Sequence, residues 1–137
     1  MTAEAFVDSG AFIAFLDASD RQHRAAVALF ADPPMRLTTS VLVVSECYGW
    51  FLHRIGENGA RTFRRLLDEL PGLRLLGADE AHREAVWRKL DDLRGAKLTF
   101  VDASSLVWLE RESIETVWGT DFDLSLEGAE VLPGPPV

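Results

Sequence analysis

Hydrophobic and polar positions along the chain follow two different periods. Short apolar runs bounded by turn residues, such as 4–7 and 73–76, are typical of buried strands. Longer stretches, such as 60–70, place apolar residues three and four positions apart, as helices with one buried face do. The pattern predicts strands at 4–7, 35–38, 73–76, 115–119 and 129–132, and helices at 11–16, 21–30, 41–55, 60–70, 78–93 and 102–113.

This alternation of strands and helices predicts the fold class. It favours an α/β protein with three layers, in which helices cover both faces of a mainly parallel central sheet. No internal repeat or Ser/Gly linker divides the chain, so we expect one domain over residues 1–137 with a tail over 132–137. Ligands of such sheets bind beyond the carboxyl ends of the strands, where Asp8 and Asp121 follow two of the predicted strands.

Composition narrows the class of protein. The 137 residues are 47% hydrophobic and 26% charged, which is usual for a globular domain and argues against disorder. No apolar run is long enough to span a bilayer, and we expect neither a signal peptide nor a membrane role. The single cysteine, Cys47, excludes an intramolecular disulfide and favours a reducing cytoplasm.

The charge balance excludes one simple mode of action. The formal net charge is −8, from 14 basic and 22 acidic residues. A protein that binds nucleic acid by charge alone has the opposite balance. Either the partner is not a polyanion, or the acidic residues gather where a metal ion reverses the sign of their field.

Four carboxylates stand out because their sequence neighbours are apolar or small. Asp8 and Asp121 follow predicted strands, whereas Glu46 and Asp102 lie on predicted helices. Taken singly, the two strand-end aspartates could be turn residues, Asp102 a helix N-cap and Glu46 a partly exposed surface residue. Glu46 is the hardest to explain in this way, since every residue three or four positions away is apolar or glycine. An unpaired buried carboxylate needs a partner, a proton or a metal ion.

The four carboxylates together predict a reaction class. Mg²⁺ and Mn²⁺ prefer oxygen ligands and keep several waters that a substrate phosphate can share. Two such ions about 3.5–4 Å apart can stabilise the attacking and leaving oxygens of a phosphodiester displacement. The bound metal would also let a polyanion approach an acidic protein. The residues therefore favour metal-dependent phosphodiester hydrolysis.

Four segments of the chain resemble the acidic motifs of a known family. They are 6–17 around Asp8, 38–46 ending in Glu46, 98–106 around Asp102, and 117–124 around Asp121 with 128–132 after it. In this order and with these separations, they resemble the PIN domain family, and more narrowly the ribonuclease toxins of VapBC toxin–antitoxin pairs. The resemblance covers nearly the whole chain.

The resemblance implies an activity, a cofactor and partners. It implies an endoribonuclease that uses Mg²⁺, or Mn²⁺ in its place, and leaves a 3′-hydroxyl and a 5′-phosphate. It also implies an antitoxin that blocks the site and a homodimer. The implied metal ligands are Asp8, Glu46, Asp102 and Asp121, with Asp123 as a further candidate. The implied substrate contacts are Ser9, Ser105 and Thr120.

Other side chains allow more than one interpretation. The apolar residues Phe51, Phe63 and Trp87 exceed what one core needs and would suit a dimer surface. Seven basic residues could contact an RNA backbone, although solvated helix faces explain those on 60–70 equally well. These are Arg21, Arg24, His53, Arg54, Arg61, Arg64 and Arg65.

Two other functions fit parts of the sequence. A PIN-like module that binds RNA or a protein without cleaving it would have the same fold, although such a module usually lacks part of the acidic set. A phosphoacceptor receiver domain also places acidic residues at strand ends. It requires an acidic pair near residue 8, where this chain has Val7 and Ser9 beside Asp8.

Overall fold

The computed structural model describes residues 3–33 and 35–136. Five strands form one sheet in the order β3-β2-β1-β4-β5, and every neighbouring pair is parallel. The strands are β1 (Glu4–Val7), β2 (Arg36–Ser40), β3 (Arg74–Leu76), β4 (Thr116–Gly119) and β5 (Glu130–Pro133). The helices are α1 (Ser9–Leu16), α2 (His23–Ala31), α3 (Val41–Arg54), α4 (Glu57–Glu69), α5 (Glu80–Asp92) and α6 (Phe100–Arg111), and a 3₁₀ turn, η1, covers Asp123–Ser125.

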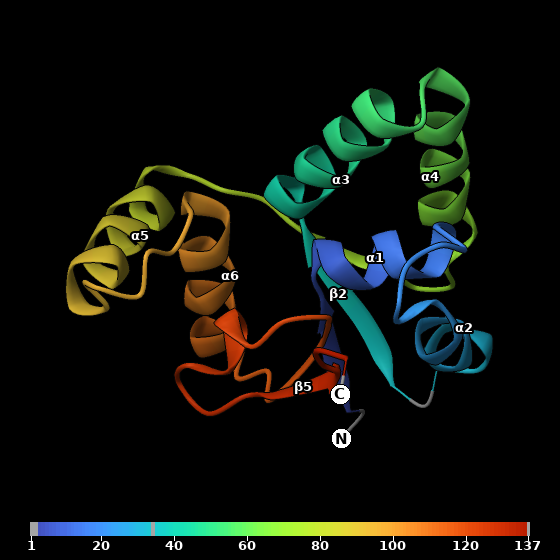
Figure 1. The fold of residues 1–137 in the computed structure, drawn as a ribbon. Helices are drawn as coiled ribbons and strands as arrows, with labels where there is room; N and C mark the ends of the chain where they lie inside the picture. Colours follow the sequence, from blue (N-terminus) through green and yellow to red (C-terminus); the bar gives the residue numbers. More distant parts are fainter. Residues whose placement is uncertain (1–2, 34, 137) are drawn as a thin grey trace.

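The helices form two layers, one on each face of the sheet. Helices α1 to α4 lie on one side, and α5 and α6 lie on the other (Figure 1). This arrangement follows from the strand order, because parallel crossovers are right-handed and the chain reverses its direction across the sheet between β3 and β4. The predicted three-layer α/β class is therefore confirmed, with a sheet that is parallel throughout.

Aromatic side chains fill the core between the sheet and helices α1 to α4. Phe12 packs edge-on against Phe63 with ring centroids 5.5 Å apart, and Phe30 meets Trp118 in the same manner at 5.0 Å. Phe51 stacks on Phe63, and both are almost completely buried. The prediction that Phe51 and Phe63 contribute to a dimer surface is therefore wrong, since this core needs both.

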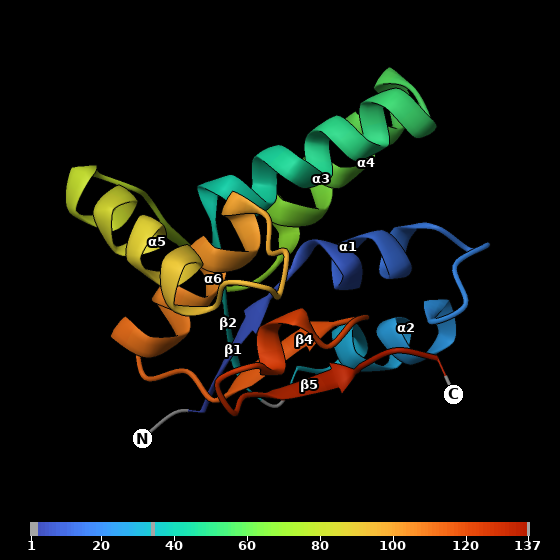
Figure 2. The same ribbon diagram turned by 60° about the vertical axis from the view of Figure 1, so that its left-hand side comes forward.

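A smaller apolar cluster joins α5 to α6. Val86 of α5 packs against Ala103 and Val107 of α6, and all three are buried. Trp87, on the next position of α5, is half exposed. Figure 2 shows this helix pair on the far side of the sheet from α1 and α2, while α3 and α4 run together away from the sheet.

Several element boundaries differ from the predicted ones. Helix α6 begins at Phe100 rather than Asp102, because Thr99 is the N-cap and Asp102, the third residue of the helix, completes a capping box with it. Helix α4 begins at Glu57, so Gly59 lies inside it rather than in a loop. Strand β5 extends to Pro133, and thus the first two residues of the predicted tail belong to the sheet, while Val137 lies outside the described residues.

The predicted start of the helix 41–55 is confirmed, since α3 begins at Val41. Ser40 is the N-cap of α3, and its hydroxyl accepts a hydrogen bond from the Val43 backbone N–H at 3.2 Å. Within residues 3–33 and 35–136, no helix has both the length and the apolar character needed to cross a bilayer.

Candidate functional site

The strand order places Asp8 at the centre of the sheet. Strands β1 and β4 are neighbours, and the connections that follow them leave in opposite directions across the sheet. Ligands of open parallel sheets bind at such a switch point. Asp8 directly follows β1, and its backbone N–H donates to the carbonyl oxygen of Trp118 in β4 at 2.9 Å. The end of β4, from which the chain leads to Asp121, therefore lies beside Asp8.

A glycine allows the two strand ends to approach each other. Gly10, in the first turn of α1, packs so tightly on Thr120 that a Cβ atom here would overlap the Thr120 hydroxyl. The same Cβ would lie only 3.2 Å from the Thr120 backbone nitrogen. This contact joins the segment after Asp8 to the residue before Asp121. We did not predict this role for Gly10, because the sequence shows only a glycine in a short turn motif.

Gly10→Ala is expected to destabilise the protein, by about 1–3 kcal/mol, because the added methyl group has no space. Thr120→Ala in the same chain removes the overlapping hydroxyl and should recover part of the lost stability. Urea denaturation of the two single variants and the double variant measures this coupling. Additive effects of the two changes would show that Gly10 and Thr120 do not constrain each other.

The other three predicted carboxylates come from different elements. Glu46 is exposed on α3, and Asp121 is exposed two residues after β4. Asp102 lies in the first turn of α6, where its Oδ2 accepts from the Thr99 backbone N–H at 3.1 Å. Asp121 Oδ1 accepts from the Asp123 backbone N–H at 3.0 Å. Each of these two bonds uses one carboxylate oxygen and fixes the direction of the side chain.

The electrostatics of Asp8 show that the four carboxylates share one field. Asp8 is only 7% exposed, and its pKa is raised from 3.8 to about 7. Burial is the main cause; the backbone N–H of Ser9 acts in the opposite direction, while the negative charges of Asp121, Glu46 and Asp102 raise the pKa further. Residues from α3, from α6 and from the segment after β4 thus act on the same buried carboxyl group.

The four carboxylates also affect the pKa values of two neighbouring side chains. Burial raises the pKa of Asp123, and the charges of Asp121 and Asp102 add to this effect. Burial likewise raises the pKa of the Cys47 thiol, with additional contributions from Asp8 and Glu46. Cys47 is completely buried and lies within the main core.

Protein cations do not neutralise this group of carboxylates. Over residues 3–33 and 35–136, no lysine, arginine or histidine forms an ion pair with any of the four. By contrast, Glu4 at the other end of β1 pairs with Arg36 and Arg74. Within the same described residues, no three acidic, histidine or cysteine side chains converge into a finished metal-binding cluster. The charges of the carboxylates therefore affect one another, but their oxygen atoms do not form a closed coordination shell.

The three predicted substrate contacts differ in accessibility. Ser9 begins α1, and Thr120 lies between β4 and Asp121; both are partly exposed. Ser105 is completely buried on α6, and its hydroxyl has no hydrogen-bond partner within the described part of the protein. A direct contact between Ser105 and a substrate would therefore require α6 to move.

Comparison with known proteins identifies the family. The sequence profile of the PIN domain matches residues 5–126. The 23S rRNA-specific endonuclease VapC20 of Mycobacterium tuberculosis is 28% identical over 130 residues, which cover 93% of this chain and 98% of that protein. The crystal structure of M. tuberculosis VapC20, a Sarcin-Ricin loop cleaving toxin, superposes with a TM-score of 0.83 at 25% identity, covering 91% of this chain and 95% of that one.

A second solved structure has the same fold. PAE2754 from Pyrobaculum aerophilum superposes with a TM-score of 0.60 at 25% identity, covering 96% of this chain and 92% of that one. The profile match, the parallel sheet and the position of Asp8 at the β1–β4 switch point agree with one another. The chain belongs to the PIN domain family, as a VapC-like member.

Proposed function

We propose that this protein is a Mg²⁺- or Mn²⁺-dependent endoribonuclease and the toxin of a toxin–antitoxin pair. The observation that carries the proposal is the buried Asp8 carboxyl at the β1–β4 switch point, in the field of Asp121, Glu46 and Asp102. The similarity to VapC20, an endonuclease by name, supports RNA as the substrate class.

The chemistry of the donors fits a hard divalent cation. All of the side chains concerned are carboxylates, which Mg²⁺ and Mn²⁺ prefer, and the described structure offers no cation to neutralise them. Asp8, Glu46, Asp102 and Asp121 would hold the metal, with Asp123 beside them. Because the carboxylates repel one another, the ion itself would draw them together. The absence of a finished cluster among the described residues is consistent with this repulsion.

The residues of the chain have separate tasks in this proposal. Bound metal would activate a water molecule for attack on the RNA phosphodiester. Asp8 provides a carboxylate fixed by the sheet, while Asp102 and Asp121 are oriented by backbone hydrogen bonds. Glu46 is free to adapt, because it is exposed in the middle of α3. The metal held by these carboxylates would bind the scissile phosphate and help keep it in line with the attacking oxygen.

Basic side chains provide a path for the RNA backbone. All seven predicted candidates are exposed, on α2, on the last turn of α3, on α4 and just before α2. These elements lie on one side of the sheet (Figure 1). They would supply local positive charge to a protein whose net charge is −8.

The proposal includes a cytoplasmic location, an antitoxin partner and a homodimer. VapC20 is named a toxin, which supports a partner that restrains the activity. Val41 and Tyr48 on α3 and Ile55 just after it are exposed and spaced by seven residues, so they lie on one face. Such an apolar face supports association with a second copy. Light scattering of the purified protein measures its mass in solution.

The activity is tested by RNA cleavage with protein freed of any bound partner. End-labelled single-stranded RNA, tRNA and ribosomal RNA are incubated with Mg²⁺, with Mn²⁺ or with EDTA. We expect cleavage that requires the metal and is lost in Asp102→Asn. Asp91→Asn, an exposed change on α5, is the matched control and should cleave like the parent.

The outcomes separate the candidate functions. Cleavage that persists in EDTA, or at the parental rate in Asp102→Asn, would remove the four-carboxylate site from the mechanism. No cleavage of any RNA together with no Mn²⁺ binding would favour a PIN-like module that binds without cleaving.

A further inference from the structure

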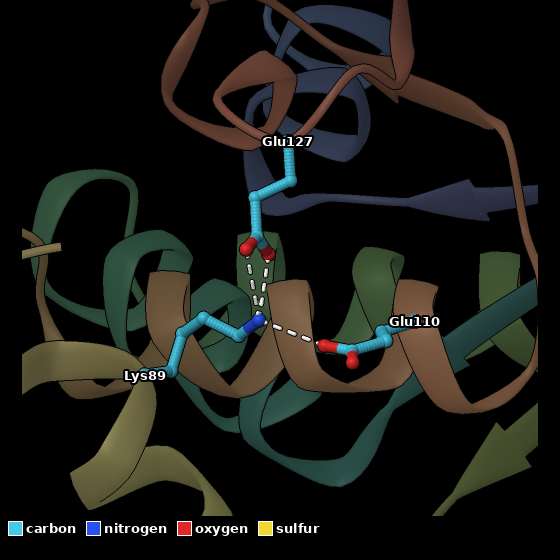
Figure 3. Close-up of polar contacts among 3 residues, drawn as sticks. All are labelled: Lys89, Glu110 and Glu127. Atoms are coloured by element: carbon cyan, nitrogen blue, oxygen red, sulfur yellow. Dashed lines mark hydrogen bonds and ion pairs between the residues drawn. The ribbon is translucent and has the colours of Figure 1, made fainter. Parts of the chain in front are cut away.

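Lys89 is a buried cation that joins three parts of the fold. Lysine is rarely buried without partners, and Lys89 is only 8% exposed. From α5, its Nζ donates to Glu110 Oε2 on α6 at 2.8 Å. It also donates to both carboxylate oxygens of Glu127, at 2.7 and 3.0 Å (Figure 3). Glu127 belongs to the connection between η1 and β5.

This connection carries part of the acidic site. Glu127 lies only four residues after Asp123 and six after Asp121. The backbone bonds from Ser125 N–H to the Phe122 oxygen and from Gly128 N–H to the Ser125 oxygen are internal to the connection. They shape it without attaching it to the helices.

Leu124 and Glu127 both anchor the connection to the body of the protein. Leu124 is buried in the main core and provides a non-directional apolar contact. Glu127 provides the second anchor through Lys89, with directional, charge-assisted hydrogen bonds. The ends of the connection are set by β4 and β5, and Glu127 adds a directional attachment between them that Leu124 does not provide.

The Lys89–Glu127 contact acts as a tether between the connection and α5, and its end on α5 is rigidly placed. Helix α5 is held on α6 by the buried cluster around Val86 and by a hydrogen bond between His82 Nε2 and Ser104 Oγ at 2.6 Å. The His82 ring also stacks on Trp108, with centroids 4.3 Å apart. Burial alone would lower the pKa of Lys89, but its two glutamate partners outweigh this effect and raise it, so the amine keeps its charge.

We propose that Lys89 is a positioning residue for the acidic site, because it fixes segment 121–129 and with it Asp121 and Asp123 relative to Asp8. Lys89 itself touches neither metal nor substrate in this role. The functional consequence rests on the proposed metal site, whereas the tether itself does not.

The test compares Lys89→Met with the parent protein. Methionine keeps the length of the side chain and removes the charge. Glu110 and Glu127 are 71% and 41% exposed at their side chains, so both can regain water and the fold should survive. Lys89→Arg retains the charge and tests rescue. Lys97→Met changes the other lysine, which is exposed, and is the matched control.

Two readouts are measured, amide hydrogen exchange and calorimetric Mn²⁺ binding. In Lys89→Met we expect exchange within 121–129 to accelerate at least about tenfold, and the affinity for Mn²⁺ to fall by about ten- to a hundredfold, as for other residues that orient ligands. Lys89→Arg should recover most of both losses, and Lys97→Met should match the parent.

Several results would overturn the proposal. Parental exchange in 121–129, or faster exchange spread evenly over α5 and α6, would mean that Lys89 does not hold the segment. Unchanged Mn²⁺ affinity in Lys89→Met would show that Lys89 does not position the acidic site. If the parent itself binds no Mn²⁺, the proposed function fails, and the exchange data alone decide the tether. If Lys89→Met does not fold, Glu127→Gln weakens the same contact, and the same two readouts apply.

Discussion

Asp8→Asn should abolish RNA cleavage and at the same time stabilise the metal-free protein. Replacing a residue that orients a metal ligand typically lowers metal affinity or activity about 10- to 100-fold. Loss of the ligand itself should lower activity at least about 100-fold. The gain in stability has a separate cause, namely that the parent keeps a carboxyl group 7% exposed among three other acidic residues. A neutral amide removes the cost of ionising that group.

The size of the stabilisation depends on pH in a defined way. The pKa of Asp8 is 3.8 as a free side chain and about 7 in the fold. Below about pH 4 the group is protonated in both states, and the variant should gain little. Above about pH 7 the parent bears the full cost of the buried charge, and the gain should be on the order of 4 kcal/mol. Urea denaturation in EDTA at about pH 4 and pH 8 measures it.

Asp17→Asn is the control with the opposite sign. Asp17 lies at the C-terminal end of α1, and hydrogen bonds from the Ser19 hydroxyl and backbone N–H lower its pKa. Its ionised form is therefore the favoured one, and its replacement should give no gain at either pH. An Asp8→Asn protein that is less stable than the parent at about pH 8 without metal would contradict the burial argument.

The pH dependence of stability should reverse when Mn²⁺ is added. Without metal, the raised pKa of Asp8 means that the free energy of unfolding is highest below about pH 4, where its carboxyl group is protonated. As the pH rises to about 7, the free energy of unfolding falls by at most about 1.4 kcal/mol per pH unit. A bound cation favours the ionised carboxylate, so stabilisation by Mn²⁺ should grow over the same interval. Thermal denaturation with and without Mn²⁺ between about pH 4 and 8 measures both slopes.

Comparison of the parent protein with Asp8→Asn shows how much of this pH dependence comes from Asp8. Other acidic residues also titrate in this interval, and the pKa of Asp123 is shifted in the same direction. The difference between parent and variant removes their common contribution. Equal slopes in the two proteins, or a Mn²⁺ effect that does not change with pH, would show that Asp8 does not control metal binding.

The sequence predicted the features that depend on local pattern. Apolar periodicity located every strand and helix, and the predicted start of the helix at residue 41 agrees with the observed start of α3. The position of Asp8 at the end of a strand was predicted, but its burial was not. The start of α6 was placed too late, because Thr99 and Asp102 cap the helix together and only one of them was considered.

Tertiary relationships were outside the reach of a single sequence. Periodicity shows that Phe51 and Phe63 lie on apolar faces, but it does not show that those faces meet each other inside one core. Gly10 and Thr120 are 110 residues apart, and only the pairing of β1 with β4 brings them together. In the sequence, Lys89 resembles any other lysine on a polar helix. Only the folded structure shows that α6 and the connection around Glu127 enclose it.

The most direct test of the central claim is to locate the metal by anomalous diffraction from crystals of the protein with Mn²⁺. The account predicts an anomalous peak coordinated by Asp8 and by at least one of Glu46, Asp102 and Asp121. Those side chains would be drawn together around the ion. Peaks confined to other parts of the surface, with the Asp8 carboxyl hydrogen-bonded only to protein groups, would contradict it.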